Sequence, residues 1–167
     1  MKIRLQYPDP TEKAFDAVIE QNSYLEGVLW ADAVHRLDMD ASRDVSTEID
    51  AYGTCNKHFW RGVIEIAGRL NEYACGEYSY PRLELEGSYS FLIKFVDFIK
   101  EEMDREGMGM YWLEEDAKLR FAASGGRLRI TGARAQDVVR LLYLGVAVAR
   151  DSSRERAEKI LAWTPKR

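Results

Sequence analysis

The sequence predicts an α+β fold in which a four-stranded antiparallel sheet carries its helices on one face. Three observations support this prediction. Two segments, near residues 69–86 and 118–130, are interpreted as hairpins, and residues 82–86, 118–121 and 127–130 within them alternate apolar and charged residues with the period of half-buried strands. Each contains a break typical of a hairpin, at Gly76 and at Ser124-Gly125-Gly126. Segments with the apolar spacing of helices precede, separate and follow the two hairpins.

From residue 57 onward the elements are expected in the order helix, hairpin, helix, hairpin, helix, helix. Asn56 is the predicted N-cap of the first of these helices, and Ser88 is the predicted N-cap of the second, which Gly107 ends. Helices are expected over residues 57–67, 89–105, 133–144 and 152–163, and strands over 69–75, 81–86, 118–121 and 127–130.

Residues 1–55 are interpreted as an N-terminal helical extension to an α+β domain that covers residues 56–167. Ser23 and Glu26 form the Ser-x-x-Glu pattern of a capping box, which predicts a helix start inside this extension. Its expected helices cover residues 11–20, 24–34 and 44–51.

The composition is that of a globular protein without a membrane partner. Of the 167 residues, 46% are hydrophobic and 31% are charged. No apolar run reaches the length of about 20 residues that spans a bilayer. The N-terminus lacks the apolar core of a signal peptide. Cys55 and Cys75 form no Cys-x-x-Cys pair and are interpreted as reduced thiols, so we expect a cytoplasmic protein.

Four segments carry a resemblance to a known family. Residues 58–70 read His-Phe-Trp-Arg-Gly-Val-Ile-Glu-Ile-Ala-Gly-Arg-Leu, and residues 80–88 read Tyr-Pro-Arg-Leu-Glu-Leu-Glu-Gly-Ser. Residues 128–132 read Leu-Arg-Ile-Thr-Gly, and residues 157–161 read Ala-Glu-Lys-Ile-Leu. In this order they resemble the motif helix, the second strand, a closing strand and the terminal helix of the LAGLIDADG homing endonuclease family. The resemblance covers about residues 56–163.

The resemblance implies an αββαββα domain whose sheet forms a saddle in the DNA major groove. It implies that motif helices pack against each other, with glycines that permit close approach. The expected helix interface, which would join two copies of the chain, consists of Gly62, Glu65, Ile66 and Gly68. Without the resemblance, Gly68 is only a helix C-cap and Gly62 a tolerated defect. In the family, the acidic residue before the last glycine of the motif binds the divalent metal that activates water.

The departures from the family's pattern fall on this chemistry. Ala67 stands where the metal-binding carboxylate is expected, and Ser152-Ser153 stands where the family has an Arg-Lys pair. Without that carboxylate the ligand that positions Mg²⁺ is missing. We therefore expect no catalytic residue, no metal site and no cofactor. If activity survives, Glu65 or Asp32 would be the metal ligand and Mg²⁺ the cofactor.

A second segment, residues 24–33, also resembles the motif. It keeps Asp32 at the acidic position, although Ala33 replaces the final glycine and no strand pair follows. This segment is either the true motif helix, a remnant first motif that pairs with the second, or an ordinary amphipathic helix with a solvated aspartate.

Six basic residues are the candidates for DNA binding: Arg69, Arg82, Lys118, Arg120, Arg127 and Arg129. Alternation places the last four on one face of the second hairpin, where like charges repel unless an anionic partner or nearby acids offset them. The alternative is a solvated face balanced by the acids at 114–116. In the first hairpin, acidic residues that would weaken binding to phosphates interrupt the arginines: Glu72, Glu77, Glu84 and Glu86. The formal net charge of −4 also argues against a strong non-specific nucleic-acid binder.

These observations lead to three functional hypotheses. The first is a LAGLIDADG-like protein that has lost nuclease activity and acts in DNA binding, regulation or protein interaction. The second is an active homodimeric endonuclease that cleaves double-stranded DNA with Mg²⁺ through Asp32 or Glu65. The third is a protein-binding module without nucleic-acid contact.

Overall fold

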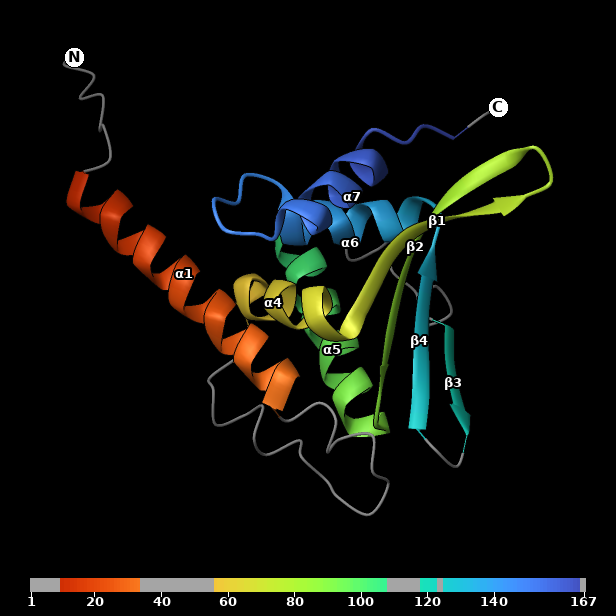
Figure 1. Ribbon diagram of the computed structural model, residues 1–167, viewed down its shortest axis with the longest axis horizontal. Helices are drawn as coiled ribbons and strands as arrows, with labels where there is room; N and C mark the ends of the chain where they lie inside the picture. The colour runs from red at the N-terminus through yellow and green to blue at the C-terminus, as the bar shows by residue number, and fades with distance from the viewer. Residues whose placement is uncertain (1–9, 34–55, 108–117, 123–124, 166–167) are drawn as a thin grey trace.

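The computed structural model describes residues 10–33, 56–107, 118–122 and 125–165 (Figure 1). The helices are α1 (Pro10–Ala33), α4 (Lys57–Ala67), α5 (Tyr89–Arg105), α6 (Ala133–Tyr143) and α7 (Asp151–Leu161). The strands are β1 (Gly68–Cys75), β2 (Tyr78–Gly87), β3 (Lys118–Ala122) and β4 (Gly125–Thr131). The α+β class expected from the sequence is confirmed, and the elements after residue 57 begin and end within a few residues of their predicted bounds.

The strands form one antiparallel sheet in the order β1-β2-β4-β3. Leu70 pairs with Leu83 across β1 and β2, and Leu85 pairs with Leu128 across β2 and β4. Residues directly opposite one another point to the same side of a sheet, so these leucines form one apolar face. Helices α4 to α7 contact the strands from that side (Figure 1).

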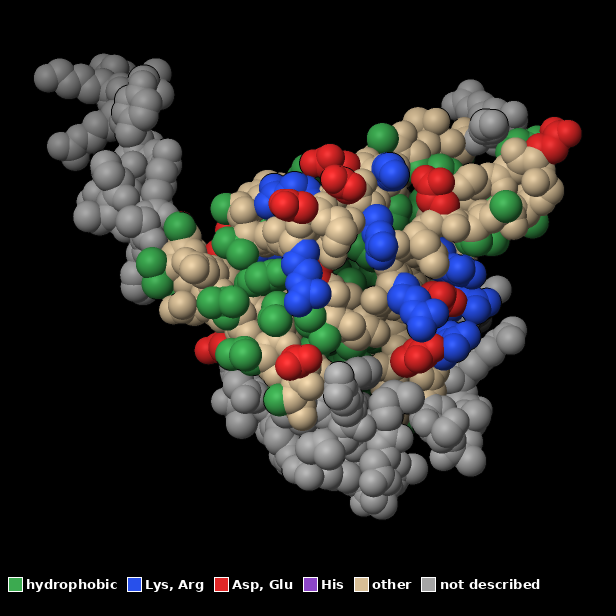
Figure 2. All heavy atoms as spheres, in the orientation of Figure 1, with side chains coloured by type: hydrophobic (Ala, Val, Ile, Leu, Met, Phe, Trp, Pro, Cys, Tyr) green, Lys and Arg blue, Asp and Glu red, His purple; other side chains and the backbone are tan. Residues whose placement is uncertain are grey.

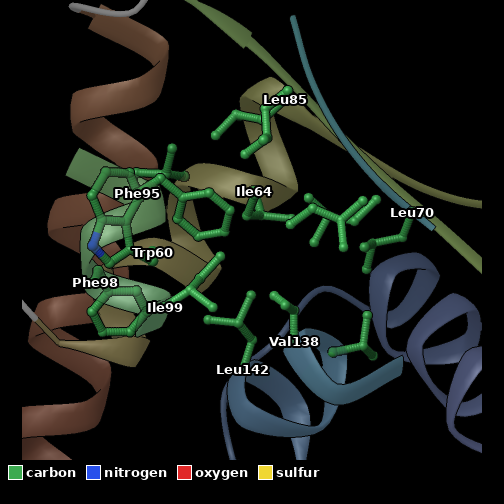
Figure 3. Close-up of a cluster of buried hydrophobic side chains, with 14 of the residues drawn as sticks. Trp60, Ile64, Leu70, Leu85, Phe95, Phe98, Ile99, Val138 and Leu142 are labelled. Atoms are coloured by element: carbon green, nitrogen blue, oxygen red, sulfur yellow. The ribbon is translucent and has the colours of Figure 1, made fainter. Parts of the chain in front are cut away.

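The hydrophobic core fills the layer between this face and the helices. Figure 3 shows apolar side chains of α4, α5 and α6 directed toward those of the sheet. On α4, the central residue of the core is Trp60. Its ring centroid lies 5.1 Å from that of Phe95 and 6.1 Å from that of Phe98. Fully or almost fully buried residues of this cluster include Trp60, Ile64, Leu70, Leu85, Phe95, Phe98, Ile99, Val138 and Leu142.

Helix α4 begins and ends as its local sequence dictates. The side chain of Asn56 accepts hydrogen bonds from the backbone N–H groups of His58 and Phe59, at 3.0 and 2.9 Å, which satisfies the first donors of the helix. The helix ends at Ala67, and Gly68 is already the first residue of β1. Because no loop intervenes, the orientation of α4 also sets the start of the sheet.

Helix α1 differs from the sequence prediction. One continuous helix replaces the two helices expected on either side of Ser23. The predicted capping box is therefore wrong, and Ser23 instead accepts a hydrogen bond from Asn56 Nδ2 at 3.2 Å. Contacts with α4 hold this part of α1 in the helix, and tertiary contacts of this kind override local capping preference. The helix expected over 44–51 lies outside the described residues.

In the described part of the chain, no helix is both long enough and apolar enough to cross a membrane. Cys75 is an exposed free thiol near the end of β1, and Cys55 lies outside the described residues.

Candidate functional site

The face of the sheet opposite the helices carries most of the arginines that the sequence singled out. Arg69, Arg82, Arg127 and Arg129 alternate with the buried leucines of β1, β2 and β4 and therefore point away from the core. Figure 2 shows Lys and Arg side chains gathered over the strands at the right of the molecule, with carboxylates between them. The pairing register places Lys118 and Arg120 of β3 opposite Arg129 and Arg127.

Two glutamates share this face, and both form ion pairs with its arginines. Glu84 accepts a hydrogen bond from Arg129 Nε at 2.9 Å, and its second oxygen lies 3.7 Å from Arg82 Nε. Glu86 accepts from Arg127 through both Nε and Nη2, at 2.9 and 2.5 Å. The three strands β1, β2 and β4 thus place four arginines and two glutamates on one surface, so the surface is basic although the whole chain is acidic.

The other acids of the first hairpin do not share this surface. Glu72 is opposite Pro81 in register, which puts it on the helix side of the ribbon, and it accepts a hydrogen bond from Ser79 Oγ at 3.0 Å. Glu77 lies in the exposed turn between β1 and β2. The sequence-based expectation that all four glutamates oppose phosphate binding is therefore wrong for Glu72 and Glu77, because strand alternation and the turn direct them elsewhere.

Helices α1 and α4 cross at two glycines. A Cβ at Gly27 would lie 2.0 Å from the carbonyl oxygen of Phe59, and a Cβ at Gly62 would lie 2.3 Å from that of Tyr24. No other residue type fits at either position without a shift of the backbones. The α4 face around Gly62, which we expected to join two copies, therefore packs against a helix of the same chain.

The remaining residues of the expected helix interface have different surroundings. Glu65 reaches α1 through a 2.7 Å hydrogen bond from the Tyr24 hydroxyl. Ile66 is half-buried against the core. The atoms closest to a Cβ built at Gly68 belong to Ile64 of its own helix, so this glycine serves the change from helix to strand.

The two positions that the sequence resemblance aligns with the family's metal ligand follow the crossing glycines by the same spacing. Asp32 lies five residues after Gly27 and is exposed, and Ala67 lies five residues after Gly62. Within the described ranges, no three His, Cys, Asp or Glu side chains come together in an arrangement that would hold a metal ion. Ser152 and Ser153 lie in the first turn of α7.

The Glu65 carboxylate has a structural role in this arrangement. Besides the Tyr24 hydroxyl, its Oε2 accepts a hydrogen bond from the backbone N–H of Arg150 at 3.0 Å. It therefore joins α4, α1 and the segment that precedes α7. Burial, the hydrogen bond to Glu65 and the charge of Glu65 together raise the pKa of Tyr24 to about 12. Both of these hydrogen bonds engage Oε2, whereas Oε1 is buried without a hydrogen-bond partner among the described residues.

Arg61 forms the centre of a second polar cluster. It is fully buried and donates to Glu20 Oε1 at 2.9 Å and to the carbonyl of Leu142 at 3.2 Å. Its Nη1 also lies 3.0 Å from Nδ1 of His58. Glu20 in turn accepts from the backbone N–H groups of Ala147 and Val148, at 2.9 and 3.1 Å.

The charge of Arg61 shifts the pKa values of Glu20 and His58. Burial alone would raise the pKa of Glu20, but the backbone hydrogen bonds and the charge of Arg61 outweigh it and hold the pKa below its usual value. Burial, and then the nearby charge of Arg61, lower the pKa of His58. Since Arg61 can only donate, His58 Nδ1 acts as an acceptor, so the imidazole is neutral.

Sequence reasoning missed this cluster because its members are far apart in the sequence. Arg61 lies 41 residues from Glu20 and 81 residues from Leu142. A local signal existed at Arg61, a charged residue on the apolar face of α4 beside Trp60 and Gly62. A charge in that position requires a partner, but the sequence alone does not say which one.

Comparison with known proteins gives no family assignment. No family model matches this chain, and no curated protein shows significant similarity to it.

Proposed function

We propose that this chain is a LAGLIDADG-like DNA-binding protein that lacks nuclease activity and contacts double-stranded DNA through the open face of its sheet. The observation that carries the proposal is the arginine-rich surface of β1, β2 and β4 in a chain whose net charge is −4. Cations concentrated on one surface attract phosphates regardless of the overall charge.

The geometry of the sheet also suits a duplex. A two-stranded antiparallel ribbon, such as β2 with β4, fits the major groove, which is about 12 Å wide. The two glutamates of the surface are already bound by Arg127 and Arg129, so they oppose phosphates less than free carboxylates would. The crossing of α1 and α4 at Gly27 and Gly62 supports the family resemblance, because both segments resemble the motif helix.

The absence of cleavage is proposed from the residues at the helix ends. Ala67 offers no ligand, and Glu65 is engaged by Tyr24 and by the backbone of Arg150. Incubation of plasmid or library DNA with Mg²⁺ or Mn²⁺ tests this part. We expect no double-strand breaks, and site-specific breaks that disappear in Asp32→Ala would support the active endonuclease instead.

The DNA-binding part is tested by fluorescence anisotropy with a labelled duplex across a series of salt concentrations. We expect affinity to fall steeply with salt, by about 0.9 logarithmic units per tenfold change in salt for each phosphate contacted. Arg69→Ala should reduce this slope by about one, because Arg69 is exposed and forms no ion pair within the described residues.

Arg140→Ala is the matched control. It removes one positive charge from an exposed position on α6, where Arg140 pairs with Asp137 at 3.0 Å. The net charge of the protein changes equally in both variants, so only a contact at the sheet would separate them. Equal effects of the two variants, or no saturable binding at low salt, would contradict the proposal.

A second candidate is a protein-interaction role, which one observation favours. Val18, Leu25 and Leu29 are 53%, 44% and 64% exposed and lie along one side of α1. Helical spacing places this side opposite the one that carries Gly27. A Leu25→Lys, Leu29→Lys double variant that loses a cellular partner while it keeps DNA affinity would establish a separate protein-binding surface.

A further inference from the structure

A pocket lies between the far end of the β1–β2 ribbon and the end of α7. Its volume of about 470 Å³ is within the usual range of small-molecule sites, about 300–1,000 Å³. The ribbon contributes Glu72, Glu77 and Tyr80 to the lining, and the segment after α7 contributes Trp163. Lys159 of α7 is the remaining charged residue of the lining. In Figure 1 this ribbon extends beyond the other strands.

Two aromatic rings form walls of the pocket. The ring centroids of Tyr80 and Trp163 lie 6.1 Å apart, and the ring planes are inclined at 47°. This inclination leaves no parallel slot for a planar ligand such as a nucleic-acid base. Two inclined ring faces instead suit a compact, rounded group that contacts both of them.

Both rings are held in place by other parts of the chain. Trp163 Nε1 donates a hydrogen bond of 2.8 Å to the carbonyl of Ser79, which ties the ring to the ribbon. Gln136 Nε2 donates to the backbone carbonyl of Trp163 at 2.7 Å. Tyr73 stacks on Tyr80, with ring centroids 5.5 Å apart. Because the rings are already fixed, a ligand does not have to immobilise them, and this reduces the entropic cost of binding.

The charges of the lining favour a cation. Glu72 and Glu77 contribute two carboxylates against the one ammonium of Lys159, so the lining is negative. Glu72 accepts a hydrogen bond from Ser79 Oγ at 3.0 Å, and this neutral donor leaves its charge in place. Glu77 is exposed and forms no ion pair within the described residues. The negative faces of aromatic rings attract cations as well.

The combination of aromatic walls and carboxylates distinguishes among cations. A primary ammonium group is strongly hydrated, and it loses water when it moves against an aromatic face. A quaternary ammonium group has no N–H to satisfy, and its methyl groups can contact both rings while its charge faces the carboxylates. Aromatic cages recognise such groups in this way.

We propose that this pocket binds a quaternary ammonium group, carried by a small molecule of the choline type or by a trimethylated lysine side chain. The site is built from Tyr80, Trp163, Glu72 and Glu77. It lies on the helix side of the ribbon, and the inference does not depend on the proposed DNA binding.

Isothermal titration calorimetry with choline chloride at constant ionic strength tests the inference. The reference ligand is the neutral carbon analogue of choline, in which a tert-butyl group replaces the trimethylammonium group. Choline should bind about tenfold more tightly, because the analogue has the same shape without the charge. In an NMR titration, the indole N–H signal of Trp163 should shift with choline, which locates binding at this pocket.

Two variants test the aromatic walls. Trp163→Leu should reduce the affinity for choline to that for the neutral analogue, because leucine offers apolar contact without a ring face. Tyr80→Leu should act in the same direction while it keeps the hydrogen bond of Trp163 to the ribbon. Circular dichroism checks that each variant is folded.

Three further variants test the charges. Glu72→Gln should weaken choline binding by about twofold to fivefold and leave the neutral analogue unaffected. Glu101→Gln is the matched control, because Glu101 is exposed on α5 outside the pocket and should change neither affinity. Lys159→Ala should tighten choline binding by a similar factor, whereas it would weaken the binding of an anionic ligand.

A short peptide with trimethyllysine distinguishes the two sources of the group. Tighter binding of this peptide than of choline would identify a protein side chain as the ligand, and weaker binding would identify a free small molecule. Equal affinities for choline and its neutral analogue would overturn the inference, because the pocket would then recognise only apolar shape. The same conclusion follows if neither choline nor the peptide binds saturably, or if Glu101→Gln weakens choline binding as much as Glu72→Gln.

Discussion

At the scale of single residues, Arg61 has the most demanding environment in the described structure. Its side chain is fully buried, yet it donates to Glu20, to the Leu142 carbonyl and toward His58. It also lies 5.4 Å from the centre of the Tyr24 ring. One side chain thereby joins α1, α4 and α6, so the fold depends on an ion pair whose second member no local sequence pattern identifies.

We expect Arg61→Met to destabilise the protein by about 3–5 kcal/mol, because removal of one partner leaves Glu20 and the Leu142 carbonyl without their donor. Methionine keeps most of the apolar stem, so packing changes little. Arg140→Met, at an exposed ion pair, should change stability by about 0.5 kcal/mol or less. Urea denaturation of both variants measures the difference. Similar losses of stability would show that the buried ion pair contributes no more to stability than the exposed one.

Two tyrosines near Glu65 offer a matched comparison. Tyr24 donates a 2.7 Å hydrogen bond to Glu65, and Tyr24→Phe should cost about 1.5–3 kcal/mol, as expected for a bond to a charged group. The hydroxyl of Tyr143 is buried and makes no hydrogen bond of ordinary geometry among the described residues, and burial, the charge of Glu65 and a side-chain interaction with Glu65 raise its pKa. Tyr143→Phe should therefore cost much less than Tyr24→Phe in the same denaturation experiment. A large loss in Tyr143→Phe would mean that its hydroxyl is satisfied after all.

At the scale of elements, the contact of α1 with α4 requires glycine at both positions of the crossing. Gly27→Ala would put a Cβ 2.0 Å from the Phe59 carbonyl oxygen, which forces the helix backbones apart. Alanine favours a helix over glycine by about 1 kcal/mol, but overpacking of this kind costs about 1–3 kcal/mol or more. We therefore expect net destabilisation and faster amide hydrogen exchange in α1.

Asn22→Ala is the control on the same helix, because Asn22 is exposed and alanine has the higher helix propensity. This variant should be slightly stabilised, with unchanged exchange in α1. If Gly27→Ala behaves in the same way, the helices have more room at the crossing than the structure indicates.

The elements themselves were largely predictable, and the exception is informative. Caps at Asn56 and Ser88 and the alternation of β2 and β4 are local signals, and the structure follows them closely. The predicted break at Ser23 was also based on a local signal, but contacts with α4 decide the conformation there. Ser23 then bonds Asn56, the cap of the helix it packs against. Local pattern fails where two segments distant in sequence share an interface.

At the scale of the whole molecule, the sequence identified the candidate surface but not its electrostatic balance. Alternation alone predicted that Arg127 and Arg129 share a face. It did not show that Glu84 and Glu86 are bound by those arginines, because the pairing register of β2 with β4 connects residues 41 and 45 positions apart. The helix pairing was open for the same reason, since the pairing of residues 24–33 with the motif at residues 58–70 was only one of three interpretations of that segment.

The stability of the whole molecule should depend on pH through the groups that join α1 to the rest. The pKa of His58 lies below its usual value of about 6.5 when the protein is folded, so the unfolded chain binds this proton first. Stability should therefore begin to fall as the pH drops below about 6.5. The pKa of Glu20 is also lowered, so its contribution is complete above the usual value of about 4.3 and is lost as the pH falls through the folded value.

The loss of stability at alkaline pH follows from Tyr24, whose pKa of about 12 lies above the usual tyrosine value of about 10. The unfolded chain ionises first, so stability should decline between these two values and be nearly constant from about pH 7 to 9.5. Urea denaturation from about pH 2.5 to 12 measures the profile. His58→Gln should flatten the decline that begins near pH 6.5, and Glu20→Gln should flatten the one below about 4.3. If the decline of stability at acid pH is unchanged in both variants, other carboxylates cause it, and the contact between α1 and α4 is insensitive to pH.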